Sequence, residues 1–210
     1  MRTVTRWLTA LLATFGAAVA AYGLTTGPPA GYAGDPGEAD CLACHGDFAM
    51  NLGGELRILG APPLYREGAT YRITVRVVSS QTAALPAPKW GFQLTAVSAV
   101  TGDGAGVFAL VGGENSQITA GTTSHPTRRY VEHLAAGTRT GVRDSAEWSV
   151  DWTAPDADLG GVEFFAAGIA ADGDGSGNGD FVYAASVAVA DTVTPVLVST
   201  WGSLKQRYRR

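Results

Sequence analysis

Two cysteines and a histidine form the segment of this sequence with the clearest chemistry. Cys41 and Cys44 are separated by two residues, and His45 follows the second cysteine directly. C-x-x-C-H is the attachment signature of haem c, in which two thiols add across the two vinyl groups of the porphyrin and the adjacent imidazole becomes the proximal iron ligand. We therefore expect one covalently bound haem at Cys41, Cys44 and His45. The chain contains no other cysteine.

Three other uses of the cysteine pair have to be weighed against haem attachment. A disulfide between them would be strained and would close almost no loop. A thioredoxin-like redox pair would lie between a strand and a helix, whereas residues 34–40 are not strand-like. Zinc could take both cysteines together with His125 and His133, but the two histidines are further apart than in zinc fingers. Haem attachment is the interpretation that the residues favour.

The second axial position of a haem iron needs a ligand, a water molecule or nothing. Met50 follows His45 by only five residues and lies on the proximal side, so we expect it to be an apolar filler. His125 lies in a loop rich in Thr, Ser and Gly, so we expect an exposed imidazole. His133 comes from a distant part of the chain, and we expect it to be the sixth ligand, the alternative being a structural histidine.

An acidic, glycine-rich loop spans residues 172–180. Its oxygen-bearing side chains stand at alternate positions, a spacing typical of calcium loops. The pattern departs from an EF-hand at its twelfth position, where Tyr183 stands in place of a bidentate Glu. A solvated hairpin turn is the simpler interpretation, and calcium is the less favoured one.

Composition limits the class of protein. With 46% hydrophobic and 16% charged residues among 210, the chain is that of an ordered globular protein with one domain and an extension. The net charge is −4, and loss of residues 1–33, which hold two Arg and no acid, would bring it near −6. A negative chain is a poor partner for nucleic acid or for anionic lipid.

The N-terminus carries the features of an export signal. Two arginines precede an apolar stretch at residues 7–24, and small residues follow. We expect a signal peptide at residues 1–33, cleaved after Ala33 or after Ala20, the alternative being an uncleaved membrane anchor. In both cases the rest of the chain would lie outside the cytoplasm, secreted, periplasmic or on the cell surface, with no membrane span in the mature chain.

The elements that must position this chemistry are short strands. Runs with a two-residue alternation or a short apolar stretch are separated by turn residues, whereas a helical period is confined to a turn or two near residues 41–51. We expect an antiparallel β-sandwich of immunoglobulin-like architecture at residues 61–192. A haem-attachment segment at residues 34–60 would precede it, and a C-terminal tail at 193–210 would follow. The expected strands cover residues 71–78, 91–97, 107–111, 148–152, 162–168 and 181–187.

A set of segments in a fixed order resembles the bacterial reeler-like domain, the group often labelled choice-of-anchor V. The resemblance covers roughly residues 41–186 and implies a secreted β-sandwich with a c-type haem motif ahead of it, without implying a known reaction. The chain departs from many members in ending without a hydrophobic anchor. The segments are Cys41–His45, Tyr71–Val75, Trp90–Leu94, Tyr130–His133, Trp148–Pro155, Val162–Gly168 and Gly179–Tyr183.

These observations predict an exported protein that carries one haem and transfers electrons, and not an enzyme, because no nucleophile and base can be paired. Its partner would be a redox protein or an extracellular electron acceptor. The alternative is a secreted binding or adhesion module in which the cysteine pair is structural.

Overall fold

The computed structural model describes residues 24–191. Residues 1–23, with most of the predicted signal peptide, and the predicted C-terminal tail at 193–210 lie outside the described part. Within residues 24–191, no helix has the length and hydropathy to cross a bilayer.

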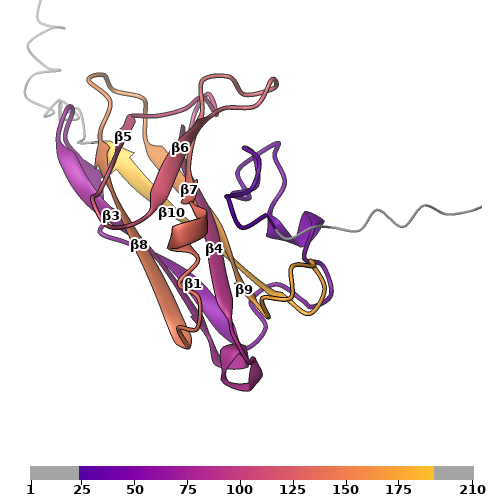
Figure 1. Ribbon diagram of the computed structural model, residues 1–210. Helices are drawn as coiled ribbons and strands as arrows, with labels where there is room; N and C mark the ends of the chain where they lie inside the picture. Colours follow the sequence, from indigo (N-terminus) through magenta and orange to yellow (C-terminus); the bar gives the residue numbers. More distant parts are fainter. Residues whose placement is uncertain (1–23, 192–210) are drawn as a thin grey trace, which may run out of the picture.

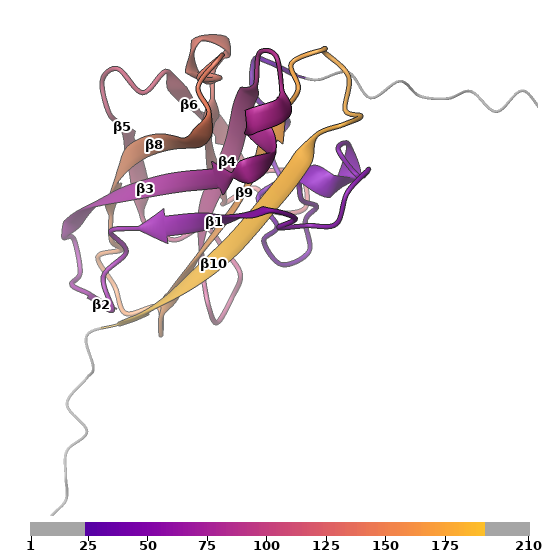
Figure 2. The same ribbon diagram turned by 90° about the horizontal axis from the view of Figure 1, so that it is seen from below.

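Two β-sheets face each other and form a sandwich (Figures 1 and 2). The four-stranded sheet has the order β1-β3-β8-β5 and the six-stranded sheet the order β2-β10-β9-β4-β7-β6. All pairs are antiparallel except β10 with β2, which is parallel. The strands are β1 (Gly54–Leu59), β2 (Leu64–Tyr65), β3 (Thr70–Ser79), β4 (Lys89–Ser98), β5 (Val107–Leu110), β6 (Ser116–Ala120), β7 (Arg129–His133), β8 (Asp144–Thr153), β9 (Val162–Ala171) and β10 (Phe181–Asp191). Three short 3₁₀ helices are η1 (Cys41–Ala43), η2 (Ser80–Ala84) and η3 (Ala135–Gly137).

The predicted antiparallel sandwich is confirmed, and each expected strand overlaps an observed one. Four observed strands, β1, β2, β6 and β7, were not among the expected ones. β1 lies inside the range expected to belong to the haem-attachment segment, yet it pairs along its whole length with β3. The sandwich therefore begins at Gly54, because Leu56 and Ile58 alternate with polar residues and bury one face of β1 in the core.

Three tryptophans fill the space between the sheets. Trp90, Trp148 and Trp152 are at most 1% exposed, and each indole N–H donates to a backbone carbonyl at 2.8 to 2.9 Å. Phe92 stacks on Trp148 with ring centroids 4.5 Å apart, and Phe164 meets Trp152 edge to face at 4.9 Å. Large aromatic groups with satisfied polar atoms stabilise the core and fix the spacing of the two sheets.

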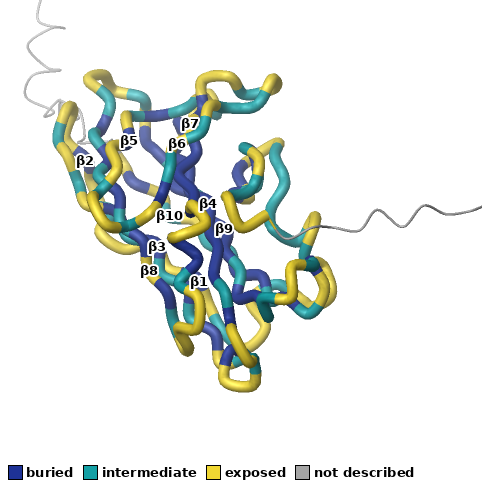
Figure 3. Tube along the Cα trace, in the orientation of Figure 1, coloured by how far each residue is buried: buried dark blue, intermediate teal, exposed yellow. Residues whose placement is uncertain are grey.

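The outer face of the six-stranded sheet is also covered. The alternation at residues 91–97 predicted one buried face, but Phe92 and Gln93 are both buried, as is almost all of β4 (Figure 3). Residues 24–40 lie beside β4 and β9, coloured indigo in Figure 1. This segment turns polar positions of β4 and β7 into buried ones, so a second, polar layer of contacts lies outside the sandwich.

Hydrogen bonds hold this N-terminal segment in place. The Gln93 side chain accepts from the Tyr32 backbone N–H at 2.6 Å and donates to the Pro29 carbonyl at 2.9 Å. Gln93 and Gln117 also donate to the two carboxylate oxygens of Glu132, each at 2.8 Å. Burial raises the pKa of Glu132, and the two amide donors partly offset that rise. Residues 24–33, ten of the thirteen residues between the two candidate cleavage points, are therefore part of the folded domain.

A buried ion pair fixes the next part of the segment. Arg128 donates to the Asp35 carboxylate at 2.5 Å, with side-chain exposures of 2% and 0%, and Tyr130 donates to the same oxygen at 2.9 Å. Desolvation and the neighbouring Asp35 raise the pKa of Tyr130, so its hydroxyl remains a donor. An ion pair shielded from water in this way is costly to break on one side only.

We predict that Asp35→Ala lowers the free energy of unfolding by about 3–5 kcal/mol, because the Arg128 guanidinium is left buried without a counter-charge. Urea unfolding followed by tryptophan fluorescence measures the loss. Asp151→Ala is the matched control, since Asp151 also meets an arginine, Arg72, at 2.5 Å but in an exposed pair. Equal losses in the two variants would contradict the prediction.

Candidate functional site

One cavity brings together the residues that the sequence singled out. It lies between the N-terminal segment and the outer face of the six-stranded sheet, is open to solvent on one side, and has a volume of about 160 Å³. The lining residues are Leu24, Thr25, Pro28, Pro29, Tyr32, Cys41, Cys44, His45, Lys89, Trp90, Gly91, Phe92, His133, Thr138, Ile169, Ala171, Gly173, Gly175, Ser176 and Asp180.

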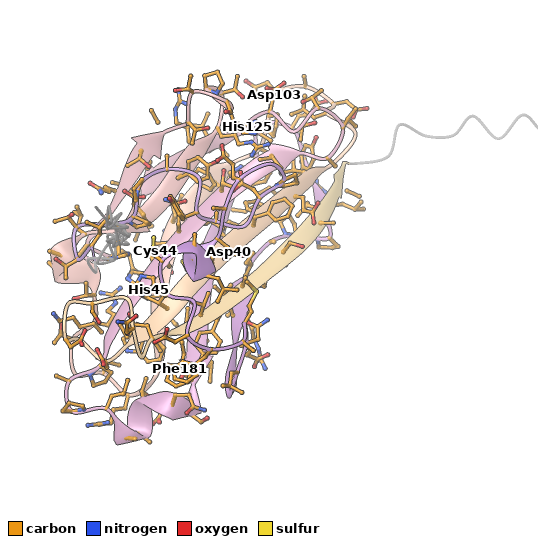
Figure 4. The ribbon with its side chains drawn as sticks, turned by 90° about the vertical axis from the view of Figure 1, so that its right-hand side faces the viewer. Asp40, Cys44, His45, Asp103, His125 and Phe181 are labelled. Carbon is orange, nitrogen blue, oxygen red and sulfur yellow. The ribbon has the colours of Figure 1, made fainter. Side chains whose placement is uncertain are left out.

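The cysteine motif lies on one wall of the cavity. Asp40 caps η1 by accepting from the Leu42 backbone N–H at 2.7 Å, and the His45 N–H donates to the Cys41 carbonyl at 3.0 Å. Cys41, Cys44 and His45 all line the cavity, and Figure 4 shows Cys44 and His45 beside this short turn. Both cysteines are free thiols.

The two thiols differ in their surroundings. Cys44 is exposed, whereas burial, together with Asp40 and Cys44, raises the pKa of Cys41 to about 12. A reactive cysteine of a redox pair has a lowered pKa, because the thiolate is the nucleophile. The environment of Cys41 thus does not resemble that of a thioredoxin-like nucleophile.

His45 is held by a carboxylate that the sequence analysis assigned to a loop. Its Nδ1 lies 2.6 Å from Oδ2 of Asp180, which is 1% exposed. Because Nδ1 is used in this contact, Nε2 is the ring nitrogen left for a ligand. A histidine that ligates a metal usually donates its other ring N–H to a carboxylate or carbonyl in the same way.

His133 lines the same cavity from the end of β7. The ring is 5% exposed, and its Nδ1 lies 3.1 Å from the backbone N and 3.3 Å from the backbone O of Phe92. Burial lowers the pKa of His133, and backbone hydrogen bonds with Phe92 and Leu24 partly oppose this. The imidazole is therefore neutral at neutral pH, the form that can ligate a metal.

Gly91 makes room for this histidine. A Cβ atom at Gly91 would lie 2.8 Å from Cε1 of His133, so a larger residue in β4 would displace the ring. Glycine inside a strand often marks such a close approach. A glycine within the alternating pattern of residues 91–97 is the feature of the sequence that could have pointed to Gly91 as part of the site.

The other candidate ligands lie elsewhere. His125 is partly buried, not exposed as expected, and its Nε2 lies 3.9 Å from Glu38, apart from Cys44 and His45 (Figure 4). Met50 lines a separate shallow pocket with Ala33 and Phe165, outside the cavity. Within residues 24–191, no three His, Cys, Asp or Glu side chains are grouped to hold a metal ion, so the four candidate zinc ligands are not assembled.

The glycine loop at 172–180 is closed by its own backbone. Asp172 accepts from the Asp174 N–H at 2.9 Å, Asp174 from the Ser176 N–H at 2.6 Å, and Ser176 from the Asn178 N–H at 3.2 Å. These successive turns use the oxygens that a calcium ion would need. The loop forms part of the cavity wall and ends at Asp180.

The cavity suits a haem in three respects. Its lining includes the apolar residues Leu24, Pro28, Pro29, Ile169 and Ala171, as an apolar macrocycle requires. The two thiols and the His45 imidazole line the same cavity. Lys89 lies at the cavity beside Gly173 and makes no ion pair with the described residues, so it could pair with a haem propionate.

Comparisons with known proteins give a likeness in fold. No protein-family model matches the chain, and no curated protein matches its sequence. Solved structures that are similar include the Reelin-N domain of F-spondin, at 21% identity and a TM-score of 0.44 over 73% of this chain and 96% of that one. A human F-spondin reeler domain has 22% identity and a TM-score of 0.41, covering 69% and 91%. A cohesin module from a Clostridium perfringens family 33 glycoside hydrolase has 9% and 0.44, covering 66% and 96%. Likenesses of this size carry no inference about the site.

We predict that iodoacetamide at neutral pH labels Cys44 well before Cys41 in the haem-free protein, because a thiol with a pKa of about 12 contains almost no thiolate. Peptide mass spectrometry after short exposures measures both rates. Labelling in urea is the control, since unfolding should bring the two rates together. Faster labelling of Cys41 in the folded protein would favour a redox pair instead.

Proposed function

We propose that this protein is an exported monohaem c-type cytochrome-like protein that transfers electrons outside the cytoplasm. The observation that carries the proposal is that Cys41, Cys44 and His45 line one apolar cavity together with His133. In this proposal the haem is bound covalently by the two cysteines and ligated by His45. Bound there, it would supply a one-electron redox couple.

The remaining roles follow from the chemistry of the cavity. The residues of the N-terminal segment would shield a bound haem from water, and exclusion of water tunes the potential of a haem. Lys89 offers the cation for a propionate. The partner would be a redox protein or an extracellular electron acceptor, and the location the periplasm, the cell surface or the medium. We also propose that the chain belongs to the bacterial reeler-like group labelled choice-of-anchor V.

His133 is the sixth ligand in this proposal. With Nδ1 accepting from the Phe92 N–H, the ring carries its proton on Nε2; with the proton on Nδ1, the same ring can donate to the Phe92 carbonyl instead. The Phe92 backbone therefore accommodates both tautomers. The second tautomer leaves the Nε2 lone pair for iron, and the backbone hydrogen bond of the ring with Leu24 would have to open if that nitrogen ligates a haem.

We predict that the chain, coexpressed with haem-attachment machinery, gains the mass of one haem and shows a c-type pyridine haemochrome spectrum. Its Soret band should survive denaturation and acid-acetone extraction, because the haem is covalent. Replacing both cysteines by serine should remove the covalent haem, and His125→Ala, outside the cavity, should leave it in place. A colourless protein with the mass of the apoprotein would refute the proposal and favour a secreted binding module.

We predict that His133→Ala converts the oxidised haem protein from a low-spin to a high-spin absorption spectrum, because the second strong axial ligand is lost. Absorption and electron paramagnetic resonance spectra measure the change, and exogenous imidazole should restore the low-spin form. His125→Ala serves again as the control. If His133→Ala leaves the spectrum unchanged, His133 is a structural residue.

A further inference from the structure

Asp180 is a buried carboxylate with two partners. It is 1% exposed and lies directly before β10. Its Oδ1 accepts from the Asp172 backbone N–H at 3.0 Å, and its Oδ2 lies 2.6 Å from Nδ1 of His45. Within residues 24–191, Asp180 has one ion-pair partner, His45. The carboxylate thus depends on one peptide N–H and one imidazole.

The burial of this carboxylate determines the orientation of the hydrogen bond. An ionised carboxylate only accepts hydrogen bonds, and removing it from water without donors is costly. With the Asp180 carboxylate as the acceptor, Nδ1 of His45 carries the proton of this hydrogen bond, and in the neutral imidazole the lone pair is then on Nε2. The 2.6 Å separation is that of a short, charge-assisted hydrogen bond.

The rest of the chain holds Asp180 firmly in this position. The successive turns of the glycine loop run from Asp172 to Asn178, and the next backbone N–H, that of Gly179, donates to Asp47 at 2.9 Å. Asp47 lies two residues beyond His45, so the loop and the haem-binding motif are joined at two points. Phe48 and Phe181, the neighbours of Asp47 and Asp180, stack with ring centroids 4.3 Å apart.

We propose that Asp180 is a positioning residue that fixes the tautomer of His45 and increases the electron donation of its Nε2, and so holds the reduction potential of the haem low. This inference rests on the proposed function. A carboxylate that accepts from a ligating histidine raises the basicity of the ligand, and a more basic ligand stabilises the oxidised metal. The acidic glycine loop then serves to deliver one carboxylate to His45.

The test compares two variants that remove one negative charge from the same loop. In Asp180→Asn, either the amide oxygen accepts from His45 without the charge, or the amide NH₂ faces Nδ1 and favours the other tautomer. Both weaken the donation, so the reduction potential should shift to a more positive value. Asp174→Asn is the matched control, because Asp174 is exposed and bonds within the loop to Ser176. Potentiometric titration of the haem proteins measures both shifts.

A second readout needs neither haem nor a variant. The full chain, expressed without haem attachment and labelled with ¹⁵N, should show His45 protonated at Nδ1 and not at Nε2 in long-range ¹H–¹⁵N spectra at alkaline pH. His125, which lies outside the cavity with its Nε2 3.9 Å from Glu38, provides the reference spectrum. Nε2 protonation of His45 would overturn the inference even if Asp180→Asn failed to fold.

The outcomes separate the two proposals. A positive shift in Asp180→Asn that clearly exceeds the shift in Asp174→Asn, with equal haem content, supports the role of Asp180. Equal shifts in the two haem-bearing variants overturn that role and leave the proposed function intact. A protein that takes up no haem overturns the proposed function, and with it the role of Asp180 in setting a potential.

Discussion

The attachment of residues 24–40 to the outer face of the six-stranded sheet is the contact on which the site depends. A sandwich of this kind ordinarily exposes one face of each sheet to water, and Gln93 and Glu132 would be surface residues there. In this protein they are buried and bonded to each other, and Gln93 also bonds the N-terminal segment. The Asp35–Arg128 pair adds a second anchor further along. Together they bring η1 and His45 against the sheet.

This arrangement makes the cavity a product of two chain segments that are far apart in sequence. The floor is the outer face of β4 and β9. The inner face of these strands packs in the core that contains the three tryptophans. The roof is an irregular segment without regular secondary structure up to η1. Backbone hydrogen bonds within the segment, from Gly34 to Ala39 and from Ala39 to Gly31, shape its turns, and its contacts with the sheet hold it in place. A cofactor attached to Cys41 and Cys44 would in turn tie the segment to the sheet.

Three buried acidic residues near this cavity have different roles. Asp35 neutralises an arginine and contributes to the attachment of the segment. Asp180 contacts the His45 imidazole and no arginine or lysine among the described residues. It therefore orients the His45 ring and, in our proposal, also increases the basicity of that ring. Glu132 accepts hydrogen bonds from the side-chain amides of Gln93 and Gln117. These two bonds connect β7 with β4 and with β6.

The sequence alone predicted the fold class and six of the ten strands found in residues 24–191, and the structure confirms both. It also predicted haem attachment at Cys41, Cys44 and His45, which stays a prediction. Hydrophobic alternation has a fixed period in strands, and the C-x-x-C-H spacing has a local chemical meaning. The sequence also predicted that His133 could approach Cys41, Cys44 and His45, and the structure places all four residues at the same cavity. It could not identify Asp180 as the partner of His45, or Gln93 and Glu132 as buried, because those depend on contacts between residues 39 to 135 positions apart. Such contacts leave no periodic or local trace. They are decided only when the N-terminal segment and the glycine loop meet on the outer face of the folded sheet.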